Sequence, residues 1–90
     1  MYMNEKEEAL VTKKTIRFSL GVSELGKVTI LNLDGVLEYS LKKGIIVTTY
    51  HPLKKEHVLH FNEKINGYQF GVVKRVLDYG KTYMAQIDFK

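Results

Sequence analysis

The feature that most constrains this chain is a two-residue alternation of apolar and polar residues that recurs between turn-forming residues. In the run 15–22 every second residue is a large apolar one, beginning at Ile16, and the run 82–89 alternates in the same way, beginning at Tyr83. Successive side chains of a β-strand point to opposite faces, so this period marks strands with one buried face. The pattern predicts an all-β fold.

Turn signals divide the rest of the chain into similar runs. Asp34-Gly35 and Asn66-Gly67 supply the positive φ angles of tight hairpins, while Lys43-Gly44 and residues 79–81 mark two further turns. The apolar parity of the longest run changes near Val72-Val73, which predicts a bulge. In addition to the alternation that begins at Lys14, we expect strands near residues 27 to 33, 36 to 41, 45 to 50, 57 to 64, 68 to 77 and 82 to 89. Six short antiparallel strands without a long helix favour a small six-stranded antiparallel β-barrel, because closure removes exposed strand edges.

The N-terminal residues do not follow this pattern. Asn4 followed by Glu7 fits a capping box, so we expect one or two helical turns from Glu5 to about Val11, which would be marginal without docking. We therefore expect residues 1–12 to be a flexible or helical segment and residues 13–90 to form the barrel domain.

Composition narrows the class of protein. Ninety residues suit one small domain, and the absence of cysteine excludes a disulfide scaffold and a thiolate zinc site. The acidic N-terminus is unlike a signal peptide, and no apolar run approaches the roughly 20 residues of a membrane span. We expect a cytoplasmic protein without a membrane span. The formal net charge of +4 attracts anionic partners, whether nucleotide, nucleic acid or acidic protein.

Candidate binding residues gather at the end of the expected strand 36–41. Glu38 and Ser40 lie on the same face of that strand, where a carboxylate and a hydroxyl can meet the edge of a nucleobase. Gly44 ends the following turn and would let a flat ligand approach the backbone. Taken singly, each residue also fits a solvated strand surface.

Basic residues upstream complete a two-part pattern. Lys13, Lys14 and Arg17 stand at the start of the first strand, and an arginine fork binds phosphate bidentately and stacks on a purine. Lys13-x-x-x-Arg17 precedes Glu38 by 21 residues, counted from Arg17. This order resembles the nucleotide site of PilZ domains, in which R-x-x-x-R precedes [D/N]-x-S-x-x-G. The strand pattern from Lys13 to Phe89 is also similar to that family, so a PilZ-like barrel is expected.

The resemblance implies a bacterial signalling adaptor without catalytic activity, which binds cyclic di-GMP and acts through a protein partner of unknown identity. Arg17 and Lys13 would hold phosphate and stack on guanine. Glu38 and Ser40 would meet the base edge, and Gly44 would permit close approach. No cofactor other than this ligand is implied.

The chain departs from the family signature at three points. Lys13 replaces an arginine, Glu38 is a methylene longer than aspartate, and the glycine arrives one residue late. A second register, which places Asn32-Leu33-Asp34 on the signature, puts Pro52 17 positions after Gly35 and matches less well. These departures bear on ligand binding more than on the fold.

Two alternatives to the nucleotide receptor stay open. One is a degenerate domain that binds only protein, and the other is a basic nucleic-acid-binding barrel of the OB or SH3-like kind. Tyrosines and phenylalanines interleave with lysines as in barrels that stack single strands, although most occupy core parity and are expected inside.

Metal and catalytic chemistry have weak support in the sequence. His57 and His60 are three residues apart on an expected strand, so they point to opposite faces, and no carboxylate cluster joins them or His51. Neither a nucleophile elbow nor an oriented base is visible. We expect neither a metal site nor an enzyme.

Overall fold

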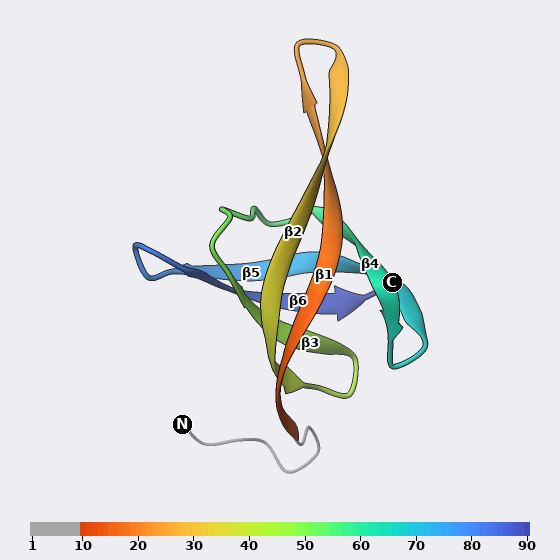
Figure 1. Cartoon of the computed structure of the whole chain (residues 1–90), viewed down its shortest axis with the longest axis vertical. Coiled ribbons are helices and arrows are strands. Elements are labelled where there is room, and N and C mark those ends of the chain that lie inside the picture. The colour runs from red at the N-terminus through yellow and green to blue at the C-terminus, as the bar shows by residue number, and fades with distance from the viewer. Residues whose placement is uncertain (1–9) are drawn as a thin grey trace.

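The computed structural model describes residues 10–90, and these form a closed barrel of six antiparallel strands (Figure 1). The strands are β1 (Leu10–Glu24), β2 (Lys27–Ser40), β3 (Gly44–Thr49), β4 (Val58–Ile65), β5 (Tyr68–Asp78) and β6 (Tyr83–Phe89). Around the barrel their order is β1-β2-β3-β6-β5-β4. Among these residues there is no helix that could cross a membrane. The expected all-β, six-stranded antiparallel barrel is confirmed.

β1 and β2 extend well beyond the barrel as a twisted two-stranded ribbon (Figure 1). β1 pairs with β4 only over Phe18–Leu20, and β2 pairs with β3 only from Gly35 onward. Residues 21–33 therefore pair with no strand other than β1 and β2, and we call this segment the arm. Leu25 and Gly26 form the two-residue turn at its tip, with φ angles of 51° and 78°.

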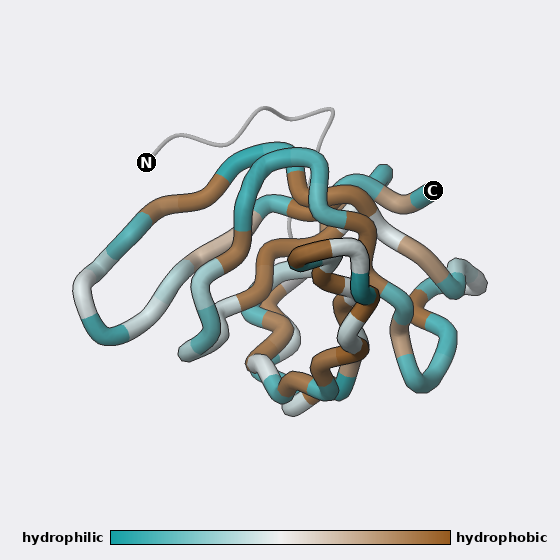
Figure 2. Tube along the Cα trace, turned by 90° about the horizontal axis from the view of Figure 1, so that it is seen from above, coloured by the Kyte–Doolittle hydropathy of each residue, from teal (hydrophilic) through white to brown (hydrophobic). Residues whose placement is uncertain are grey.

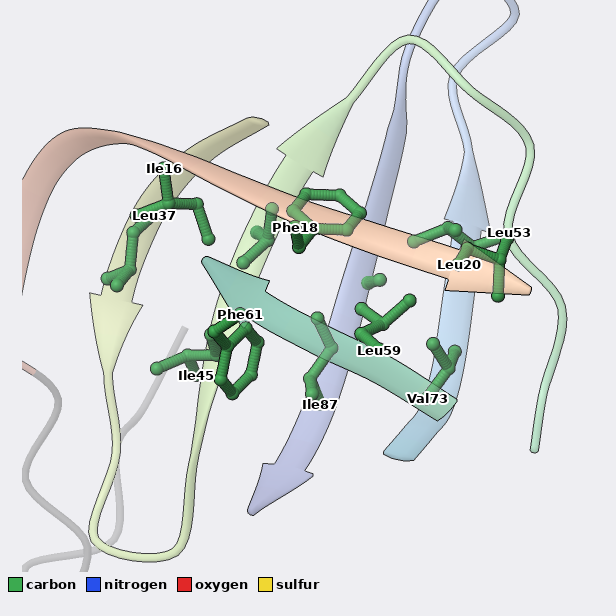
Figure 3. Close-up of a cluster of buried hydrophobic side chains, with 12 residues drawn as sticks. Ile16, Phe18, Leu20, Leu37, Ile45, Leu53, Leu59, Phe61, Val73 and Ile87 are labelled. Carbon is green, nitrogen blue, oxygen red and sulfur yellow. The ribbon is translucent and has the colours of Figure 1, made fainter. Parts of the chain in front are cut away.

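The barrel interior is filled by the inward side chains of its strands. Figure 3 shows side chains of β1 and β4 pointing into one cluster, and Phe18, Leu20 and Phe61 there are at most 1% exposed. Leu53, from the loop before β4, packs into the same cluster. Apolar and polar residues alternate along much of the trace in Figure 2, as a sheet with one buried face requires. The buried core consists of Ile16, Phe18, Leu20, Leu37, Ile45, Val47, Leu53, Leu59, Phe61, Val73, Ala85 and Ile87.

The prediction of a hairpin turn at Asp34-Gly35 is wrong, because these residues lie inside β2. A Cβ atom at Gly35 would lie 2.7 Å from Cγ1 of Val47, so the glycine is needed for close packing inside the barrel. The two strands expected near 27 to 33 and 36 to 41 are consequently one. The turn itself lies at Leu25-Gly26, where a leucine adopts a left-handed conformation that leucine rarely occupies.

Other expected features are present. Asn66-Gly67, with φ angles of 50° and 86°, joins β4 to β5, and residues 79–81 join β5 to β6. The register between β5 and β6 shifts between Val73 and Arg75, beside the expected bulge. These two turns between strands, and the register shift in β5, therefore occur where the sequence predicts them.

The expected N-terminal helix falls largely outside the described residues. Of the residues expected in it, Leu10 and Val11 are described, and they lie in β1. The described part of the barrel thus begins before Lys13, the residue at which we expected the domain to start.

Candidate ligand-binding site

A bulge near the start of β1 sets the position of Lys13. The register between β1 and β2 shifts between Val11 and Lys14, and Lys13 has a φ angle of 49°. Its Nζ forms an ion pair with Oε1 of Glu38. The hydrogen bond from Lys13 lowers the pKa of Glu38, and the same bond raises the pKa of Lys13. The structure therefore joins two of the predicted site residues, and the carboxylate already has a cationic partner.

Arg17 meets a different carboxylate. It lies opposite Asp34 across the β1–β2 ladder, and its Nε is 3.3 Å from Oδ1 of Asp34. Both side chains are exposed, and exposed pairs of this kind contribute only about 0 to 1 kcal/mol. Such a weak pair leaves the guanidinium able to bind an anion. Asp34 belongs to the second register of the signature, the one that matched less well in the sequence.

A groove of about 440 Å³ opens between β1 and β4. It forms because the two strands pair only over Phe18–Leu20 and run apart beyond that point. Its lining carries three cations and one carboxylate, and comprises Lys14, Thr15, Ile16, Arg17, Asn62, Glu63, Lys64 and Ile65. Within the described chain, neither Lys14 nor Lys64 forms an ion pair. With three cations against one carboxylate, the lining carries net positive charge.

Neither Ser40 nor Gly44 belongs to the lining of this groove. The Oγ of Ser40 accepts a hydrogen bond of 2.9 Å from Nδ2 of Asn66, the residue that follows Ile65 of the lining. A Cβ atom at Gly44 would lie 2.0 Å from the carbonyl oxygen of Ile87. Close approach of β3 to β6 is thus sufficient reason for a glycine at this position.

The β4 side of the groove was missed in the sequence. In the sequence, residues 62–65 have the pattern of an ordinary strand end. No sequence motif connects Lys64 to Lys14 or Arg17. In the structure the β4–β5 register is irregular between His60 and Ile65, and the Gln69 side chain donates a hydrogen bond of 2.5 Å to the carbonyl of Phe61. Residues 62–65 and 14–17 are far apart in the sequence, and they line one groove only because closure of the barrel makes β1 and β4 neighbours.

The aromatic residues are less buried than expected. Of those in residues 10–90, only Phe18 and Phe61 are buried, so the expectation that most pack in the core is wrong. The inward positions of β5 belong to Gly71 and Val73, which leaves Tyr68 and Phe70 on the outside. The exposed aromatics are Tyr50, Tyr68, Phe70 and Tyr79.

The histidines have separate surroundings. Nδ1 of His57 accepts a hydrogen bond of 3.0 Å from the backbone N–H of Lys54, and burial lowers the pKa of His57. His60 packs against Phe70, with ring centroids 5.0 Å apart. In the part of the chain that the structure describes, no group of three or more His, Cys, Asp or Glu could hold a metal ion.

Comparison with known proteins gives this chain no relative: no family model matches it, and neither does any curated protein or solved structure.

Proposed function

We propose that this chain is a non-catalytic, PilZ-like signalling adaptor of the cytoplasm that binds cyclic di-GMP and acts through a protein partner. The observation that carries the proposal is the groove between β1 and β4, whose lining contains the cations Lys14, Arg17 and Lys64 and a single carboxylate, Glu63. Cyclic di-GMP is anionic at its phosphodiesters, and lysine and arginine bind such oxygens through charge-assisted hydrogen bonds. The groove therefore has the charge that this ligand requires.

Individual roles follow from the contacts of each residue. Arg17 is the fork that grips phosphate or stacks on guanine, since its exposed pair with Asp34 costs little to break. Ser40 offers a hydroxyl that is hydrogen-bonded to Asn66, the residue after Ile65 of the groove lining. Glu38 can meet a base edge only after its pair with Lys13 opens, so ligand binding couples these two residues.

Calorimetric titration with cyclic di-GMP tests the proposal. The double change Lys14→Glu and Lys64→Glu reverses two groove cations, and affinity should fall by at least about tenfold, roughly 1.4 kcal/mol. The matched control is Lys55→Glu with Lys81→Glu, which alters net charge equally at exposed lysines outside the groove lining. The control should bind like the unmodified protein.

Three results contradict the proposal in different ways. Absence of binding by the unmodified protein removes cyclic di-GMP as the ligand. Equal weakening by both double variants shows a general charge effect and no groove. Binding of a short single strand with a steep salt dependence, in place of cyclic di-GMP, favours the nucleic-acid alternative, to which the exposed Tyr68 and Phe70 would contribute stacking.

A further inference from the structure

The arm presents two strand edges with no partner in the described chain. On β1 the open edge runs over Gly21–Glu24, because pairing with β4 ends at Leu20. On β2 it runs from Lys27 to the point where pairing with β3 begins at Gly35. The β2 edge is the longer of the two. An open edge is a ready template for another strand.

The turn at the tip determines which backbone groups face outward. In a two-residue hairpin turn the fourth residue, here Lys27, donates to the first, Glu24, so the backbone groups of Lys27 point toward β1. Hydrogen-bonding direction alternates along an antiparallel strand. Val28, Ile30 and Asn32 therefore direct their N–H and C=O groups toward the open edge. Beyond them the carbonyl of Asp34 accepts a 2.9 Å hydrogen bond from Oγ1 of Thr49, which marks where the open edge ends.

This edge lacks the usual protection against pairing. Proteins guard open edges with proline, bulges or inward charges. Residues 27–33 contain no proline, the β1–β2 register is regular throughout the arm, and the sole charge, on Lys27, lies next to the tip. Val28 and Ile30 are 70% and 60% exposed on the same face. A segment of high β-propensity and little charge is of the kind that pairs with other strands.

The charge distribution favours a second copy of the same chain as the occupant. Glu24 and Lys27 are the only charged residues of the arm and cancel, so the whole net charge of +4 resides outside it. Two arms can therefore meet without electrostatic repulsion. Antiparallel pairing also sends the two cationic barrels to opposite ends of the joined arms.

We propose that two copies of this chain dimerise by antiparallel pairing of their β2 edges, with Ile30 opposite Ile30 of the second copy. A two-fold axis perpendicular to the sheet places even-numbered residues of one copy opposite even-numbered residues of the other. The residues whose backbone groups face the open edge, Val28, Ile30 and Asn32, are all even-numbered. In this register Val28 lies opposite Asn32 of the second copy, and all three outward residues are paired. Lys27 lies opposite Leu33, so no like charges face each other. The result is a four-stranded sheet made of two arms.

The register also accounts for the tip. It carries Leu25 of each copy toward the end of β3 of the other, because β3 occupies the next stretch of the same β2 edge. Leu25 is 98% exposed, and Tyr50, which follows β3, is 80% exposed. Dimerisation brings these two apolar surfaces toward each other.

Sedimentation equilibrium of the full chain over a dilution series tests the proposal. The unmodified protein should show a reversible monomer–dimer equilibrium. Ile30→Lys places two ammonium groups across the axis and should weaken dimerisation by at least about tenfold. The control is Ser23→Lys, which adds the same charge to the same face of the arm but on β1, where residue 23 of one copy lies about three strand spacings from residue 23 of the other. Ser23→Lys should dimerise nearly as well as the unmodified protein.

The opposite results overturn the proposal. A monomer at every concentration up to about 1 mM excludes the dimer as a specific state. A dimer that survives Ile30→Lys, in protein shown by circular dichroism to be folded, uses another surface. Ile30→Cys gives an independent check: under oxidation it should form a disulfide-linked dimer, because directly opposite Cα atoms lie within disulfide range, whereas Ser23→Cys should not. Cross-linking at Ser23 and not at Ile30 would also contradict the register.

Discussion

The same two strands serve two different environments in this molecule. Where β1 and β2 belong to the barrel, their inward residues are nearly inaccessible, and Phe18 is 1% exposed. A few residues further along, in the arm, Val28 and Ile30 are equally apolar and mostly exposed. The difference is the number of neighbours: barrel residues have strands on both sides and a closed interior, and arm residues have one partner strand. The local sequence therefore determines that these residues form strands, whereas closure of the barrel determines which of their side chains are buried.

The largest expected effect separates barrel from arm by stability. Phe18→Ala leaves a cavity in the closed core and should lower the free energy of unfolding by about 3 to 5 kcal/mol. Ile30→Ala, measured in dilute protein, should change it by less than about 0.5 kcal/mol. Denaturant unfolding of both variants provides the test. Similar losses would mean that the arm is an integral part of the folded core.

The glycines offer a second contrast between the two regions. A methyl group at Gly44 would collide with the backbone of Ile87 at 2.0 Å, so Gly44→Ala should cost about 1 to 3 kcal/mol or more. At Gly21, in the arm, the same methyl group meets only side chains, those of Ile30 at 3.6 Å and Val28 at 3.8 Å, which are ordinary contacts. Gly21→Ala should be neutral or slightly stabilising, because alanine restricts the unfolded chain. A harmless Gly44→Ala would show that β3 can move away from β6, and would reopen a ligand role for this glycine.

A smaller effect concerns the pH dependence of the free energy of unfolding, to which His57, outside the arm, contributes. The lowered pKa of His57 means that, below its ordinary value of 6.5, the unfolded chain binds a proton that the folded chain resists. Stability should therefore be complete above pH 6.5 and decline as pH falls toward the folded pKa. His57→Gln removes the titrating group and should flatten this decline, as measured by denaturant unfolding between about pH 5 and 7.5. An unchanged slope would assign the pH dependence to other groups.

Much of the barrel could be predicted from the sequence, because alternation and turn dipeptides act locally. The errors occur where the outcome depends on a distant strand. Asp34-Gly35 has the composition of a turn, yet Gly35 is required by Val47 across the barrel, and the true turn contains Leu25. For the same reason the motif residues Lys13 and Glu38 could be proposed from their spacing, whereas Lys64 enters the groove only because the barrel closes.

Residue-resolved amide hydrogen exchange tests the division between closed barrel and open arm most directly. Val47 pairs with strands on both sides, and its amide should exchange only through global unfolding at any protein concentration. The amide of Ile30 faces the open edge, so it should exchange rapidly in dilute protein and slowly once the arms pair. The contradicting result is an Ile30 amide that is protected in the dilute monomer, or one that stays unprotected at the highest concentration.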